Sequence, residues 1–202
     1  MKIQILILAG VLAMSGTAHA LDLAGVPLIV SGDLSAGYSS TSVATGYKAP
    51  TILMYGVGAT VAYKFYGPLF AGVSPGFQYG AQLSETGATG SGSNYRGSRF
   101  YLNTTVGADV TENIRVSADF EFLGNWSLYA KNAAGQSTSF AGPLGAKIKA
   151  THKLPWLDGR LSGGLQGEYL TFSKMNREGT TALDLTTKQK LWSAGLIVQA
   201  NF

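Results

Sequence analysis

The chain of 202 residues contains no cysteine. Disulfide bonds, thiolate catalysis and cysteine-ligated metal centres are therefore excluded, and stability must come from backbone pairing and apolar burial. Charged residues are scarce, at 13%, and the formal net charge is only +4. Because this charge is weak and scattered, we expect no nucleic acid partner. The two histidines, His19 and His152, are too few for a histidine-based metal site, and we expect no metal or cofactor.

A long apolar run is also missing from most of the chain. Although 46% of the residues are hydrophobic, no run after the amino terminus approaches the roughly 20 residues that a transmembrane helix needs. The amino terminus has the three parts of a secretory signal: Lys2, an apolar core over residues 3–14, and the small-x-small step Ala18-His19-Ala20. We predict a signal peptide over residues 1–20, export through the inner membrane, and one mature domain over residues 21–202.

Hydrophobic residues follow a period of two instead. From Trp192 to Phe202, apolar residues fill every second position, and small or polar residues fill most of the positions between them. Similar alternation recurs in segments of about ten residues, the length that a tilted strand needs to cross a bilayer. Pro75 falls inside one segment and predicts a β-bulge there. The eight predicted strands cover residues 28–38, 53–63, 69–83, 100–110, 114–122 with a continuation through Trp126 and Leu128 left open, 144–151, 160–169 and 192–202.

The connections between these segments alternate in length. Residues 66–68, 111–113 and 154–158 form short connections, whereas 39–50, 84–97, 130–139 and 173–187 form long ones rich in Gly, Ser and Thr. Bacterial membrane barrels alternate short periplasmic turns with long outer loops in the same way. We therefore predict an all-β fold: a closed antiparallel transmembrane β-barrel of eight strands in an up-and-down meander. Ten strands would split a loop without alternation, and a soluble lipocalin-like barrel or sandwich would place charges outside.

Aromatic residues should collect near the two membrane interfaces of such a barrel. At the predicted periplasmic ends of the strands stand Tyr63, Phe65, Tyr66, Trp156 and Phe202. At the predicted outer ends stand Tyr38, Tyr79, Phe100, Trp126, Tyr169 and Trp192. Both groups agree with the membrane interpretation.

With its terminal aromatic strand, the chain resembles the small Gram-negative outer-membrane β-barrels of the A/X type and the opacity type. The resemblance implies a monomer in the cell outer membrane, in contact with outer-membrane lipid and lipopolysaccharide. It also implies biogenesis through periplasmic chaperones and the barrel-assembly machinery. In that family the machinery reads the terminal strand, and the resemblance assigns this role to Phe202, Trp192, Leu196 and Val198.

The polar faces of the strands carry charges of both signs that should converge inside the barrel. They are Asp33, Arg99, Asp109, Arg115, Asp119, Glu121, Lys147, Lys149, Arg160 and Glu168. An eight-stranded interior is just wide enough to be filled by side chains, so we expect these charges to pair as a polar plug. The alternative is a gated, ion-selective path. Inward glycines of the second and third strands would leave one wall hollow unless long Arg and Lys side chains fill it.

Catalysis is the least favoured function. The resemblance brings in outer-membrane lipid A acyltransferases, deacylases and proteases, whose activity depends on a histidine. Only His152 remains after the signal, and it stands beside a predicted periplasmic turn without a matching Ser or Asp. We therefore expect no enzymatic activity, and a lipid-modifying enzyme ranks third among the functions.

The leading function is a structural and surface-interaction role carried by the extracellular loops. Charge-assisted contacts suit phosphate groups, so basic residues in or near the long loops are candidates for lipopolysaccharide contact. These residues are Lys48, Arg96, Lys131, Lys174 and Arg177. The second function is a narrow channel for small or apolar solutes.

Overall fold

The computed structural model describes residues 27–41, 51–84, 94–131, 137–155, 159–177 and 183–202. The signal peptide expected over residues 1–20 lies outside these ranges and stays a prediction. Within the same ranges no helix has the length and apolarity to cross a membrane. The strands are β1 (Leu28–Thr41), β2 (Thr51–Tyr66), β3 (Leu69–Ser84), β4 (Asn94–Asp109), β5 (Ile114–Lys131), β6 (Ser137–Lys153), β7 (Leu161–Arg177) and β8 (Leu183–Asn201).

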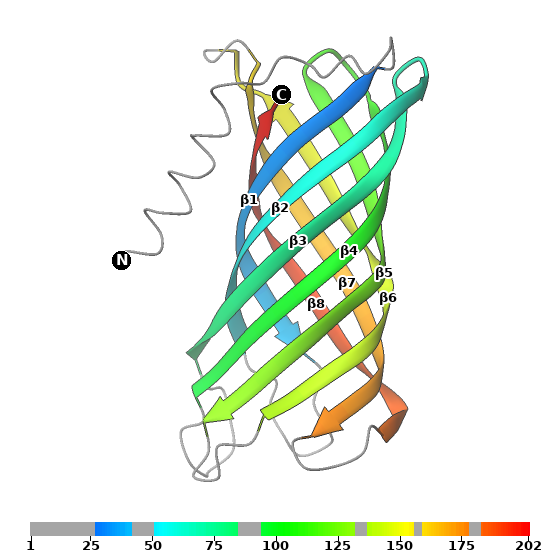
Figure 1. Cartoon of the computed structure of the whole chain (residues 1–202). Helices are drawn as coiled ribbons and strands as arrows, with labels where there is room; N and C mark the ends of the chain where they lie inside the picture. Colours follow the sequence, from blue (N-terminus) through cyan, green and yellow to red (C-terminus); the bar gives the residue numbers. More distant parts are fainter. Residues whose placement is uncertain (1–26, 42–50, 85–93, 132–136, 156–158, 178–182) are drawn as a thin grey trace.

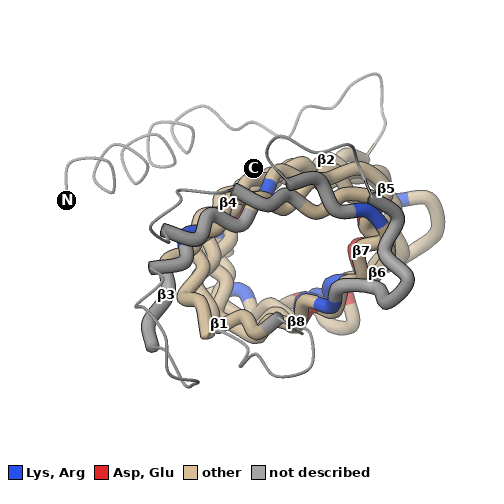
Figure 2. Tube along the Cα trace, turned by 90° about the horizontal axis from the view of Figure 1, so that it is seen from below, with Lys and Arg blue, Asp and Glu red and all other residues tan. Residues whose placement is uncertain are grey.

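Each strand pairs antiparallel with its neighbours in sequence, and β1 pairs with β8 to close the sheet. The closing ladder runs from Ser31 opposite Asn201 to Thr41 opposite Leu191. The strands therefore form a tilted, closed barrel in up-and-down order (Figure 1), and the view along its axis shows an oval ring (Figure 2). This confirms the predicted fold class with eight strands rather than ten.

The two ends of the barrel have different connections. At one end, called the turn end, β2 joins β3 through Gly67, whose φ of 51° suits glycine. The connections from β4 to β5 and from β6 to β7 lie at the same end, as does the end of β8 (Figure 1). The second of these, 154–160, is longer than the predicted 154–158 and longer than the connections 132–136 and 178–182 at the opposite end. At the opposite end, called the loop end, the strands are joined by segments outside the described residues.

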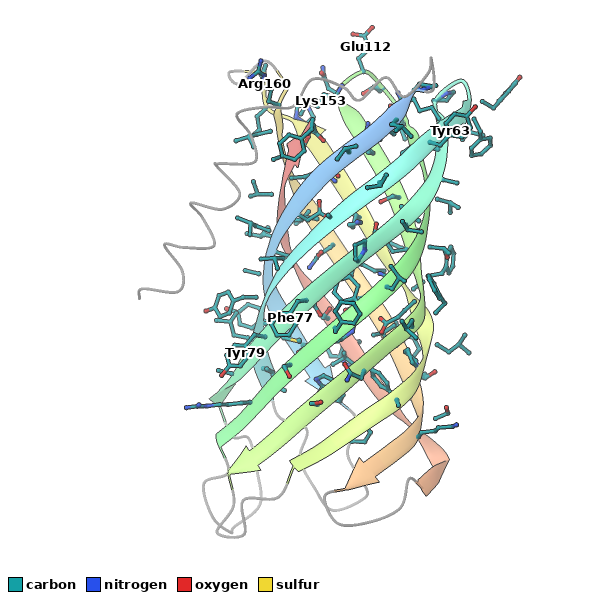
Figure 3. The ribbon with its side chains drawn as sticks, in the orientation of Figure 1. Tyr63, Phe77, Tyr79, Glu112, Lys153 and Arg160 are labelled. Atoms are coloured by element: carbon teal, nitrogen blue, oxygen red, sulfur yellow. The ribbon has the colours of Figure 1, made fainter. Side chains whose placement is uncertain are left out.

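The outer surface is apolar and most of the inner face is polar, the reverse of a soluble barrel. Large apolar side chains, such as Phe77, point outward (Figure 3). They are strongly exposed, for example Leu196 at 63%, Ile148 at 59% and Phe77 at 46%. Polar neighbours on the same strands, such as Lys147 and Gln78, are buried. Because apolar exposure on this scale is rare in soluble monomers, the outer surface is built to contact another apolar phase.

Exposed aromatic side chains form two bands on this surface. Tyr63, Phe65 and Tyr66 at the end of β2 form the band at the turn end. A second band lies toward the loop end and contains Tyr38, Tyr79, Phe100, Tyr169 and Trp192. The prediction that Trp126 joins this second band is wrong, because its side chain is fully buried. Trp156 lies outside the described residues.

Trp126 points into the barrel rather than outward because β5 contains a β-bulge. The β4–β5 register shifts where Leu102 faces Leu123 and Asn103 faces Glu121, so Phe122 is an extra residue on β5. Inward positions on β5 are therefore odd-numbered before the bulge and even-numbered after it. The bulge expected at Pro75 does not form, because the β3–β4 register continues through Pro75 and the β2–β3 register is the same on both sides of it.

The strands are also longer than the alternating pattern predicted. They run for 14 to 19 residues, well beyond the 9–11 or so that cross a bilayer. Residues 94–97, 137–139, 173–177 and 183–187, expected in loops, continue the strands at the loop end. Backbone pairing does not require alternating hydrophobicity once both faces of a strand are polar, so the sequence pattern does not mark this extension.

Candidate functional site

The interior of the barrel holds the densest polar chemistry of the described chain, and its centre is Arg99 on β4. The Arg99 guanidinium donates two hydrogen bonds to Glu168, of 2.8 and 2.9 Å, and one to the Gln78 side chain, of 3.1 Å. It also donates to Glu121. Side chains of Arg99, Glu121 and Glu168 are at most 2% exposed. A forked cation held between two carboxylates is strongly oriented, because its planar donors match both acceptors.

A tyrosine fills the space beside this cation. Tyr101 points inward from β4, and its ring lies 4.9 Å from the Arg99 guanidinium carbon and 4.2 Å from Lys147 Nζ. A Cβ atom at Gly76 would overlap this ring, and one at Gly58 would lie 3.3 Å from its hydroxyl. The glycine-lined wall is therefore filled, but largely by Tyr101 and other nearby side chains rather than by the Arg and Lys side chains expected. Arg99, Glu121, Glu168 and Lys147 are called the Arg99 cluster.

A second group of charges lies closer to the turn end. Lys149 Nζ is 2.9 Å from Asp119 Oδ2 and 3.5 Å from Asp33 Oδ2, and these three residues are called the Lys149 cluster. Asp119 accepts a hydrogen bond of 2.9 Å from Thr105, and Asp33 accepts one of 2.9 Å from Gln199. Each carboxylate thus has both an ionic and a neutral partner, as buried charges require.

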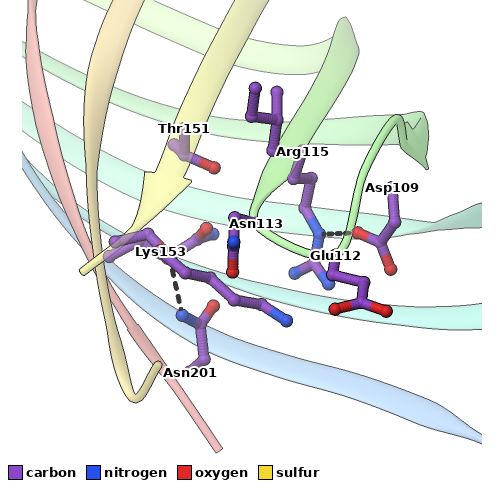
Figure 4. Close-up of a pocket in the computed structure, with 10 residues that line it drawn as sticks. Asp109, Glu112, Asn113, Arg115, Thr151, Lys153 and Asn201 are labelled. Atoms are coloured by element: carbon purple, nitrogen blue, oxygen red, sulfur yellow. Dashed lines mark hydrogen bonds and ion pairs between the residues drawn. The ribbon is translucent and has the colours of Figure 1, made fainter. Parts of the chain in front are cut away.

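The third group lies at the turn end itself. Asp109 Oδ2 is 2.6 Å from Lys64 Nζ, and Asp109 Oδ1 accepts a hydrogen bond of 2.7 Å from Arg115 Nε (Figure 4). Lys64, Asp109 and Arg115 are called the Asp109 cluster. Two cavities of about 10 Å³ each lie beside Arg115, and both are lined by Thr151 and Gln199. Each has room for about one water molecule, so neither is a binding site for a larger solute.

The loop-end side of the interior is apolar. Trp126 stacks on Phe140 and Phe172 at centroid distances of 5.3 and 5.7 Å. All members of this group are at most 8% exposed, and the group is called the apolar seal. Its members are Ile52, Met54, Trp126, Phe140, Leu170, Phe172 and Leu191.

Exposure of the charges falls steadily from the turn end toward this seal. In the Asp109 cluster the side chains are 17–35% exposed, and in the Lys149 cluster they are 1–12% exposed. In the Arg99 cluster, next to the seal, they are at most 4% exposed. Water therefore reaches the interior from the turn end, while the described residues leave no open path through the Arg99 cluster and the seal.

The structure places all but one of the predicted interior charges inside the barrel. The exception is Arg160, which precedes β7 on a turn and is exposed (Figure 3). Its placement in the interior was wrong, because the alternating face of β7 begins only at Leu161. Lys64 takes its place in the charge balance. Lys64 continues the inward positions Thr60 and Ala62, so a longer second strand would have included it.

The remaining candidate residues lie on the outside of the barrel. Trp192, Leu196 and Val198 are exposed on β8, and the Phe202 backbone N–H donates a 2.9 Å hydrogen bond to the Val30 carbonyl. Arg96 and Lys174 are exposed toward the loop end. His152 is exposed on β6 near the turn end, opposite Ile114 and Gly163. For the other predicted lipopolysaccharide contacts, Lys48 and the side chains of Lys131 and Arg177 lie outside the described part of the structure.

These features define a class: a closed eight-stranded barrel, apolar outside and polar inside, with the fold of small outer-membrane β-barrels. No family model and no curated protein matches the chain. Among solved structures, Neisserial surface protein A superposes with a TM-score of 0.59 at 10% identity, over 87% of this chain and 97% of that one. The attachment invasion locus protein of Yersinia pestis gives a TM-score of 0.54 at 12% identity, over 86% and 98%. At these identities the likeness establishes the fold.

Proposed function

We propose that this chain is an integral outer-membrane protein whose turn end faces the periplasm and whose loop end faces the cell exterior. The exposed apolar surface between two aromatic bands supports insertion in a bilayer. The fold shared with outer-membrane proteins supports the same location. The two shortest connections, 67–68 and 110–113, lie at the turn end, and the two longest, 42–50 and 85–93, join strands at the loop end. This difference supports the orientation, since bacterial barrels keep their short turns in the periplasm.

Within that membrane, the barrel serves a structural and surface-interaction role rather than transport. One observation carries this choice: the interior is closed by the Arg99 cluster and the apolar seal, whose side chains are almost fully buried. A closed interior leaves the loop end as the part of the molecule that can meet a partner. The strands extend beyond the outer aromatic band there, so they raise the surface-exposed segments away from the bilayer.

Cations at this end suit contact with lipopolysaccharide phosphates. Arg96 on β4 and Lys174 on β7 are both exposed near the outer aromatic band. Their side chains can reach the headgroup layer, where charge-assisted hydrogen bonds to phosphate are strong. Catalysis is not part of this proposal, because His152 lies near the turn end on the outer face, away from the interior carboxylates. Monomeric insertion through periplasmic chaperones and the barrel-assembly machinery completes the proposal.

Cysteine labelling tests the insertion and its orientation, because the natural chain contains no cysteine. Two single variants are used in intact cells: Arg96→Cys, near the loop end, and Glu112→Cys, on the exposed turn after β4 (Figure 3). A membrane-impermeant maleimide should label Arg96→Cys at once and Glu112→Cys only after the periplasm is opened. Labelling of Glu112→Cys alone in intact cells would reverse the orientation, and recovery of the protein in the soluble fraction would reject the membrane location.

A further inference from the structure

The ladder between β5 and β6 is interrupted in the loop-end half of the barrel. Phe120 pairs with Ala146, and pairing resumes only where Asn125 meets Ala141. Between them, Glu121–Gly124 of β5 and Gly142–Gly145 of β6 form no pairs with each other, although all these residues are described. At a rise of about 3.3 Å per residue, the interruption is roughly 13 Å long. Both strands keep their ladders to β4 and β7 over most of this stretch.

The local sequence explains the interruption. On β6, Pro143 has no N–H to donate, and Gly142 has a φ of 66° that is incompatible with regular strand geometry. On β5, the extra residue Phe122 displaces the strand at the same level. Hydroxyl groups from β7 hold β6 on its other side: Thr171 donates to the Leu144 carbonyl at 3.1 Å and Ser173 to the Gly142 carbonyl at 3.3 Å.

An interruption at this level faces lipid. Phe122, Leu123 and Leu144 flank it and are 54%, 55% and 65% exposed. Tyr169 of the outer aromatic band is opposite Ala146, just below the interruption. Backbone groups without a partner are costly in hydrocarbon, so a stretch without the β5–β6 ladder favours a polar partner at the boundary between acyl chains and headgroups. Exposed apolar side chains lie beside this break in the ladder, a combination that suits an amphiphilic ligand.

A cation stands beside the same stretch. The Lys174 side chain passes Gly142, where a Cβ atom would lie 3.9 Å from Lys174 Cγ. Lys174 is exposed, and no ion pair joins it to any described residue. Asp184 is opposite it in the β7–β8 ladder. An exposed ammonium next to unpaired backbone provides donors for an anion such as phosphate.

Two buried polar atoms lie behind the interruption. Glu121 Oε1 and Trp126 Nε1 have no hydrogen-bond partner among the described residues. Glu121 is buried and lies against Gly124 within the interruption, while Trp126 belongs to the apolar seal. Both side chains point into the barrel interior, so these two atoms are not part of a site on the outer wall.

We propose that the β5–β6 interruption is a lateral binding site for one acylated, phosphate-bearing lipid of the outer leaflet. The phosphate binds Lys174, hydroxyl or amide groups of the lipid backbone satisfy the unpaired strand, and acyl chains cover Phe122, Leu123 and Leu144. This inference rests on the proposed membrane insertion and adds a defined lipid site to it. The site would fix one lipid at a set position on the barrel wall.

Native mass spectrometry of the full-length folded barrel tests the chemistry. The probes are bisphosphorylated lipid A, the same lipid without phosphates, and phosphatidylcholine. Bisphosphorylated lipid A should be retained most strongly, and Lys174→Gln should weaken it about tenfold, the equivalent of one charge-assisted hydrogen bond. The matched control Arg160→Gln removes an exposed cation from the turn before β7, at the turn end and away from the interruption, and should change retention little. Equal losses in the two variants, or equal retention of all three lipids, would overturn the proposal.

Photocrosslinking tests the position without changing Lys174. Benzoylphenylalanine replaces Leu144 or, as the control, Leu165, which is 64% exposed on β7 in the turn-end half. In vesicles containing bisphosphorylated lipid A, the residue at position 144 should capture it several times more often than the residue at position 165. Equal capture of lipid A at positions 144 and 165, in barrels that have inserted, would reject the lipid site but leave the proposed membrane location standing. Failure of the wild-type barrel to insert rejects the site together with the proposed function.

Discussion

Charged residues inside the barrel stabilise it as ion pairs. Replacing one partner leaves the other charge buried without a counter-charge. Glu168 is the clearest case, because it receives two hydrogen bonds from Arg99 and lies 3.8 Å from Lys147. Removing one partner of a buried ion pair typically costs about 3–5 kcal/mol, because the other charge stays buried without compensation. The Arg99 cluster therefore determines stability more than its small number of residues suggests.

We predict that Glu168→Gln lowers the free energy of unfolding by roughly 3–5 kcal/mol. The measurement is urea-induced unfolding of the barrel in lipid vesicles. Glu112→Gln makes the same chemical change on an exposed turn at the barrel end and should leave stability within about 0.5 kcal/mol of wild type. A tolerated Glu168→Gln would mean that the cluster is solvated in the membrane.

Glycine substitutions give a second residue-scale prediction. A Cβ atom at Gly76 would overlap the Tyr101 ring, whereas one at Gly163 on β7 would meet no atom within 4 Å. Gly76→Ala should therefore destabilise the barrel by about 1–3 kcal/mol through overpacking, and Gly163→Ala should have little effect. The same urea titration compares them. Equal effects would show that Tyr101 does not occupy the glycine-lined wall.

At the scale of elements, alternation predicted every strand and most of their inward faces. It succeeded because side chains of a strand point alternately to its two sides, and each side here meets a different solvent. Ser74, Asn103 and Thr105 are buried as that rule requires. Strand membership and orientation are thus local properties, readable from about ten residues at a time.

The residues whose positions the alternating hydrophobic pattern predicted wrongly share one physical cause. Trp126 faces inward because the bulge at Phe122 exchanges the two faces of β5, and the bulge depends on pairing with β4. Lys64 was left out of the predicted interior and Arg160 was wrongly included, because strand ends are set by the partner strand rather than by local hydrophobicity. Contacts across the interior, such as Arg99 with Glu168, join residues 69 positions apart. These features depend on register, which one sequence segment does not encode.

The outward face of β2 allows a test at this scale. Val57 lies between Leu34 of β1 and Phe77 of β3, within the apolar surface between the two aromatic bands. We predict that Val57→Arg destabilises the folded barrel in vesicles by about 2–4 kcal/mol, because a charge near the bilayer midplane is poorly solvated. Glu112→Arg, on the exposed turn, is the control and should be tolerated. Similar tolerance at both positions would contradict the membrane depth assigned to β2.

At the scale of the whole molecule, the order of charged clusters and apolar packing along the barrel axis determines whether ions can pass through the interior. Among the described side chains, five cations and five anions face the interior and form the three clusters described above: Lys64, Arg99, Arg115, Lys147 and Lys149 with Asp33, Asp109, Asp119, Glu121 and Glu168. Because these two signs balance, the three clusters together carry no net charge to attract one kind of ion. The apolar seal then separates the most buried cluster from the loop end.

We therefore predict that the barrel reconstituted in a planar bilayer shows no large, steady, porin-like conductance. Eight strands leave an interior that side chains can fill, whereas aqueous porins use about twice as many strands. An ion entering from the turn end would meet cavities of only about 10 Å³. It would then have to separate Arg99 from Glu121 and Glu168 and displace the stacked rings of Trp126, Phe140 and Phe172.

Two variants make the conductance measurement decisive. Glu121→Gln and Lys147→Gln each remove one interior charge, of opposite sign, without altering the apolar seal. If the interior is closed, both variants should stay as silent as wild type, since the rings of the seal still block the axis. Stable single-channel steps in the wild type, with opposite shifts of ion selectivity in the two variants, would show that ions pass the Arg99 cluster. That result would replace the surface-interaction role with a channel.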